Sequence, residues 1–96
     1  MKETVAEKIV VIKNAQGLHA RPAALFVQIA NKYDCEIVIS KGNVKVSGKS
    51  IMGIMMLEAG KGARVTITAI GDDAQTAVDE LEKVIASNDE DLGAVR

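Results

Sequence analysis

The order of hydrophobic and polar residues divides the chain into seven segments. Continuous or alternating apolar residues predict strands over 7–12, 35–40, 43–47 and 64–69. Apolar residues three and four positions apart predict helices over 20–33, 50–57 and 73–86. The resulting order, βαββαβα, contains no internal repeat and no linker. It predicts an α+β domain of two layers, with the helices on one face of the sheet.

The same pattern indicates which side chains form the core. In 64–69, apolar and polar residues alternate, so every second side chain should face inward. Segments 35–40 and 43–47 are joined by a short turn, which predicts an antiparallel pair. The residues expected to face inward are Phe26, Ile29, Ala30, Tyr33, Cys35, Ile37, Ile39, Val44, Val46, Val65, Ile67, Ala69, Ala74, Ala77, Val78, Leu81, Val84 and Ile85.

The length of 96 residues predicts a single domain, 1–96. Its core should extend over about 7–86. Residues 87–96 are acidic and lack periodicity, so they are expected to form a flexible tail. Hydrophobic residues make up 48% of the chain and aromatic residues only 2%, so aliphatic side chains must fill the core.

Charge and cysteine content exclude several classes of protein. A formal net charge of −1 argues against a dedicated binder of nucleic acid or anionic membrane, which needs a basic stripe. A single cysteine forms no internal disulfide and favours a reducing compartment. There is no signal-like apolar stretch at the N-terminus and no run of membrane-spanning length, so we expect a cytoplasmic protein that does not insert into membranes.

The segment 17–23 holds the only histidine, His19, and the only proline, Pro22. It lies between the first strand and the first helix, and a helix N-terminus presents free N–H groups that bind anions. The backbone amides of Ala20 and Arg21 are therefore expected to bind phosphate oxygens, with the Arg21 guanidinium as a clamp. The helix N-terminus and Arg21 both disfavour a protonated ring, which makes His19 a candidate nucleophile.

Simpler interpretations of these residues remain open. A lone histidine at this position is often only a surface residue that caps the helix, and Arg21 is then a solvated charge. Cys35 on a strand is expected to be a core residue rather than a reactive one. One histidine and one cysteine do not make up the usual zinc ligand set, so neither a metal nor a cofactor is expected.

The segment 50–57 is apolar on nearly all sides. Ser50 is expected to cap this short helix, and Ile54 and Leu57, three positions apart, should share its buried side. This leaves Ile51, Met52 and Met55 at least partly exposed. Such a patch is typical of a partner surface, although methionines also fill gaps in cores.

Two stretches resemble the HPr family, the histidine-containing phosphocarriers of bacterial phosphotransferase systems. Segment 17–23 is similar to the family's active-site signature, and 49–55 is similar to its regulatory-serine segment. The two stretches are separated as in the family, and the resemblance extends from about Glu7 to about Ile85. It implies an open-faced sandwich whose four-stranded antiparallel sheet has the strand order 1-4-2-3.

The resemblance also implies roles for these residues. Enzyme I of the phosphotransferase system would place a phosphoryl group on Nδ1 of His19, which would pass it to a sugar-specific EIIA domain. An HPr kinase/phosphorylase would phosphorylate Ser50 beside a partner interface formed by Ala20 and the exposed side chains of 51–55. Gln16 departs from the family, which often has Asn or Ser there, and this puts one phosphate contact in doubt.

The leading hypothesis is thus a monomeric phosphocarrier that depends on partner enzymes and is not itself an enzyme. The alternative is a regulatory binding module, in the nitrogen-related branch of the family or bound to a transcriptional regulator, whose phosphorylation state is a signal. A carrier shows net flux of phosphate to an acceptor, whereas a signalling module shows only altered binding. An independent hydrolase is disfavoured because the sequence shows no second candidate catalytic site.

Overall fold

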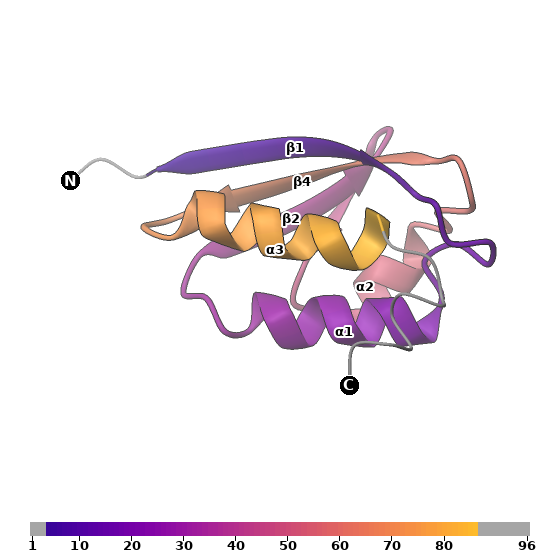
Figure 1. The fold of residues 1–96 in the computed structure, drawn as a ribbon, viewed down its shortest axis with the longest axis horizontal. Helices are drawn as coiled ribbons and strands as arrows, with labels where there is room; N and C mark the ends of the chain where they lie inside the picture. Colours follow the sequence, from indigo (N-terminus) through magenta and orange to yellow (C-terminus); the bar gives the residue numbers. More distant parts are fainter. Residues whose placement is uncertain (1–3, 87–96) are drawn as a thin grey trace.

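A computed structural model describes residues 4–86 of the chain. The predicted order βαββαβα is confirmed (Figure 1). The predicted tail, 87–96, lies outside the described residues. The elements are β1 (Val5–Val11), α1 (Ala20–Ala30), β2 (Glu36–Lys41), β3 (Val44–Ser47), α2 (Ile51–Met56), β4 (Arg64–Ile70) and α3 (Ala74–Ala86).

The four strands form one antiparallel sheet in the order β1-β4-β2-β3, as the family resemblance implied. Strand β4 lies in the interior of the sheet, where Val65 pairs with Val10 of β1 and Ile67 pairs with Ile39 of β2. These side chains are buried, because alternate residues of paired strands point to the same face. The expected alternation along β4 is confirmed.

The helices pack on one face of the sheet and the other face is open, which gives a two-layer open sandwich (Figure 1). Phe26 of α1 and Leu81 of α3 are fully buried in the core between the layers. On the open face of the sheet, by contrast, the side chain of Ile9 in β1 is 66% exposed. The aliphatic core expected from the composition is therefore present on one side of the sheet only.

Two expectations about side chains and boundaries are wrong. Val44 was expected to face inward, but its side chain is 49% exposed, whereas Val46 packs against the core as expected. Val44 is the first residue of β3, a short strand at the edge of the sheet, where a side chain has neighbours on fewer sides. Helix α1 ends at Ala30 rather than Tyr33, because Asn31 closes the helix and residues 31–33 form a turn.

Tyr33 nevertheless packs against the core and links the end of α1 to α3. Its hydroxyl donates a hydrogen bond to Glu80, and the Lys32 ammonium lies 2.8 Å from the other carboxylate oxygen of Glu80. The hydrogen bonds from Lys32 and Tyr33 lower the pKa of Glu80 from its ordinary value of 4.5. The same carboxylate raises the pKa of Tyr33 to about 12.

This linkage makes the stability of the fold depend on pH. Because the pKa of Glu80 is lowered on folding, its contribution is present above pH 4.5 and is lost as the pH falls through the lower, folded value. We expect Glu80→Gln to lower the free energy of unfolding at pH 7 by no more than about 1 kcal/mol, as for other exposed ion pairs. Urea unfolding should show that the difference from wild type disappears in acid. Glu36→Gln, at an exposed carboxylate on β2, is the control. An equal loss of stability in that variant would show that the effect does not come from the contacts of Glu80 with Lys32 and Tyr33.

Candidate functional site

The loop between β1 and α1 is built on a buried asparagine. Asn14 is 2% exposed, and its side-chain oxygen accepts a hydrogen bond from the backbone N–H of Gln16 at 3.2 Å. Its backbone carbonyl accepts a hydrogen bond from the N–H of Gly17 at 2.9 Å. These bonds close a turn in which Gly17 has φ +73°. The side chain of Gln16, the residue that departs from the family pattern, is exposed.

The same loop is fastened to the chain that follows α2. The N–H of Leu18 donates a hydrogen bond to the carbonyl of Ala59 at 2.8 Å. A Cβ at Gly17 would lie 2.8 Å from the Cα of Gly60 and closer still to the carbonyl oxygen of Ala59. A side chain therefore does not fit at position 17 without moving backbone. The residue before His19 is held by a segment forty residues further along the chain, between Leu57 and Gly60.

His19 lies at the N-terminus of α1, as the sequence predicted. It is half-buried and occupies the N-cap position, but its side chain makes no capping hydrogen bond. The imidazole is therefore not used as a helix cap, which was the simpler interpretation of this residue.

The first turn of α1 suits an anion. The first hydrogen bond of the helix runs from the N–H of Ala23 to the carbonyl of His19, and Pro22 has no N–H. The amides of Ala20 and Arg21 precede that bond, so helix geometry does not satisfy them. Both residues are exposed, and no acidic side chain stands in the first turn. His19, the two unsatisfied amides and the residue Arg21 thus stand together in the first turn, at the positive end of the helix.

Helix α2 presents the predicted apolar surface. Ser50 caps the helix by accepting a hydrogen bond from the N–H of Gly53 at 3.0 Å. Ile54 and Leu57 are buried, as expected. The exposed side chains, here called the methionine face, are Ile51, Met52, Met55 and Met56. Met56, which is 69% exposed, was missed as a member although it belongs to the same apolar run.

Helix α2 packs beside the helix that carries the candidate nucleophile. Helices α1 and α2 pack against each other, and α2 lies near the end at which α1 begins (Figure 1). The contact between Leu18 and Ala59 joins the same two regions. The structure therefore brings the chain that follows α2 against the loop of His19, although the two are far apart in sequence.

Two lysines that the sequence did not single out fasten the ends of α2. The Lys49 ammonium donates to the carbonyl of Tyr33 at 2.8 Å. The Lys41 ammonium donates to the carbonyls of Leu57 and Glu58 at 3.1 and 3.0 Å. The sequence carries no signal for either contact, because a lysine in a turn is usually solvated.

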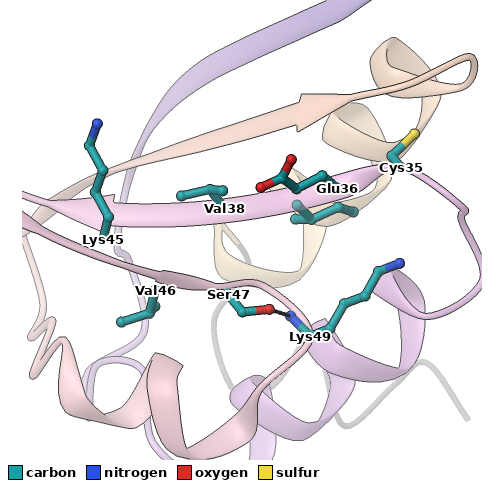
Figure 2. A pocket seen from close by; sticks show the side chains of 8 residues that line it. Cys35, Glu36, Val38, Lys45, Val46, Ser47 and Lys49 are labelled. Carbon is teal, nitrogen blue, oxygen red and sulfur yellow. Dashed lines mark hydrogen bonds between the residues drawn. The ribbon is translucent and has the colours of Figure 1, made fainter.

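A shallow pocket of about 380 Å³ lies along β2 and β3 and ends at Lys49, next to the start of α2. Figure 2 shows its lining side chains, which include Cys35, Val38 and Lys45 and none of the candidate site residues. The candidate nucleophile is thus carried on the surface and not in this pocket. Within 4–86, no three of the histidine, cysteine and acidic residues are grouped so as to hold a metal ion. No helix in that range has the length and hydrophobicity needed to cross a membrane.

Comparison with known proteins identifies the family. The family described as "PTS HPr component phosphorylation site" matches residues 6–87. The HPr-like protein Crh of Halalkalibacterium halodurans is 49% identical over 77 residues, which are 80% of this chain and 92% of that protein. The crystal structure of the phosphocarrier protein HPr of Bacillus anthracis has a TM-score of 0.81 and 45% identity, covering 85% of this chain and 98% of that one.

A third match is a crystal structure of Crh from Bacillus subtilis, which is a dimer with a swapped domain. It has a TM-score of 0.68 and 43% identity, and covers 79% of this chain and 87% of that one. The fold, the strand order and these matches agree with one another. The chain therefore belongs to the HPr family of phosphocarrier proteins of the phosphotransferase system.

Proposed function

We propose that this protein accepts a phosphoryl group from enzyme I on Nδ1 of His19 and passes it to EIIA domains. The observation that carries the proposal is the placement of His19 at the N-terminus of α1, beside two amides and Arg21. In each transfer a nitrogen–phosphorus bond forms at the acceptor as the donor's bond to phosphorus breaks. Such reactions depend on positioning and charge stabilisation more than on covalent assistance.

The residues of the first turn have separate tasks in this transfer. The amides of Ala20 and Arg21 bind equatorial oxygens of the phosphoryl group, and the dipole of α1 favours its charge. The guanidinium of Arg21, on an exposed side chain, follows the group as it arrives and departs. Because the site is on the surface, donor and acceptor dock on it in turn. The protein thus acts as a cytoplasmic carrier that needs partner enzymes and no cofactor.

The proposal is tested by incubating the protein with phosphoenolpyruvate, magnesium and a bacterial enzyme I. Intact-mass spectrometry should show a single phosphoryl adduct that is labile in acid and stable in alkali. Fragmentation without acid should locate it on the peptide that contains His19. Addition of an EIIA domain should then remove it. A folded sample that forms no adduct, or an adduct that survives acid, would overturn the proposal.

We also propose that phosphorylation of Ser50 by an HPr kinase/phosphorylase regulates this transfer. Ser50 stands at the edge of the methionine face, which together with Ala20 serves as the docking surface for partner proteins. A phosphate at the start of α2 is tolerated locally, but it places negative charge on the rim of an apolar interface.

Ser50→Asp is accordingly expected to slow phosphorylation of His19 by at least about tenfold, the effect of roughly 1.4 kcal/mol. Initial rates with enzyme I measure the effect, and an unchanged circular-dichroism spectrum excludes a folding defect. Ser50→Asn, which retains a capping side chain without charge, is the matched control. Equal rates for the Asp and Asn variants would contradict the electrostatic mechanism.

The second candidate function is a regulatory module that binds a transcriptional regulator, or a protein of the nitrogen-related branch. The similarity to Crh and the exposure of the methionine face favour it. Net flux of phosphate from phosphoenolpyruvate to an EIIA domain would decide for the carrier.

We further propose that the protein is a monomer, unlike the Crh dimer of Bacillus subtilis. Light scattering at micromolar concentration tests this.

A further inference from the structure

The turn that ends α2 adopts an unfavourable backbone conformation. Glu58, which follows the C-cap residue Leu57, has φ +50°. Among residues 4–86 it is the one non-glycine residue with a positive φ. This left-handed conformation is usual for glycine after a helix and disfavoured for residues with a Cβ. Contacts around Glu58 must therefore hold the turn in place.

Lys41 supplies such a contact. It is the last residue of β2, a strand that is hydrogen-bonded on both sides, and its ammonium binds the carbonyls of Leu57 and Glu58. A positive charge at the C-terminus of a helix is favourable, and hydrogen bonds from an ammonium are stronger than neutral ones. Lys41 thus bridges a rigid strand and the strained turn.

The turn in its unusual conformation supports the loop of His19. Ala59, directly after Glu58, is 2% exposed, and its carbonyl accepts the hydrogen bond from Leu18. If the turn relaxed at Glu58, the Ala59 carbonyl would rotate away from Leu18. The residue adjacent to the nucleophile would then lose its anchor.

We propose, building on the function proposed above, that Lys41 is a positioning residue for His19 and acts through Glu58 and Ala59. It does not touch the phosphoryl group or the partner proteins. Its removal changes how firmly the loop before α1 is held, and therefore how often the imidazole is aligned for transfer.

The first test compares Lys41→Met with Lys45→Met. Both remove one positive charge, but Lys45 is an exposed residue on β3. We expect Lys41→Met to slow phosphorylation of His19 and to accelerate hydrogen exchange of the Leu18 amide by about three- to tenfold each, through local opening of the loop. Lys45→Met should change neither. Unchanged exchange at Leu18 in Lys41→Met would overturn the proposal.

The second test is a rescue by Glu58→Gly in the Lys41→Met background. Glycine adopts the left-handed conformation without a steric cost, so the turn no longer needs the lysine. The double variant should regain the exchange protection and the transfer rate of the wild type. A failure to regain them would show that Lys41 acts otherwise, for example by contacting a partner. Hydrogen exchange at Leu18 tests the contact itself even if enzyme I does not phosphorylate the wild type.

Discussion

Replacement of His19 by alanine is expected to abolish the phosphoryl adduct altogether. His19 is the only histidine in the chain, so no second imidazole can accept the group in its place. Its side chain is half-buried, so we expect the free energy of unfolding to fall by about 1 kcal/mol, the usual size for a point substitution, and the variant to remain folded. Intact-mass spectrometry and urea unfolding measure the two effects.

Ser50→Ala is the control for this substitution. It removes the other proposed phosphorylation site and should leave the acid-labile adduct intact, although it loses the cap of α2. An adduct of equal amount on His19→Ala would place the phosphate elsewhere and would contradict the assignment. Loss of the adduct in Ser50→Ala but not in His19→Ala would likewise contradict the assignment of the phosphate to His19.

The fold was largely predictable because its hydrophobic pattern is local. Val65, Ile67 and Ala69 alternate along β4 with polar residues, and the apolar stripe of α3 recurs at helical spacing. Val44 shows the limit of this reasoning. Its alternation looks the same as that of a buried strand, but it is exposed because it begins β3 at the edge of the sheet, whereas Val46 further along the same strand packs against the core. Strand order is a tertiary property, which came from the family resemblance and not from the pattern.

The candidate site was predictable only where its residues are adjacent in sequence. His19, Ala20 and Arg21 were identified from one short segment, and the structure places them as expected at the start of α1. Lys41 and Ala59 were not identified, because each acts on the site through a backbone carbonyl. Almost any residue type can supply a carbonyl. Contacts to backbone carbonyls therefore cannot be predicted from the composition of the chain or from the spacing of its residues.

Gly17→Ala is expected to damage both the stability and the function of the protein. The residue has φ +73°, and a Cβ there would collide with the carbonyl of Ala59 and the Cα of Gly60. The left-handed conformation costs an alanine about 1–2 kcal/mol, and loss of the hydrogen bond from Leu18 adds about 1 kcal/mol. We therefore expect the free energy of unfolding to fall by about 2–3 kcal/mol, measured by urea unfolding.

The same collision should slow phosphorylation of His19 by about a hundredfold, because displacement of a reacting group by about 1 Å has effects of that size. Gly42→Ala is the matched control, since Gly42 has φ +58° in an exposed turn with no atom within 4 Å of an added Cβ. Gly42→Ala should lower the free energy of unfolding measured in urea, because of its left-handed conformation. Its rate of phosphorylation by enzyme I should equal that of the wild type. If Gly17→Ala also reacted at the wild-type rate, the contact with Ala59 would not position the nucleophile. His19 would then be held by α1 alone.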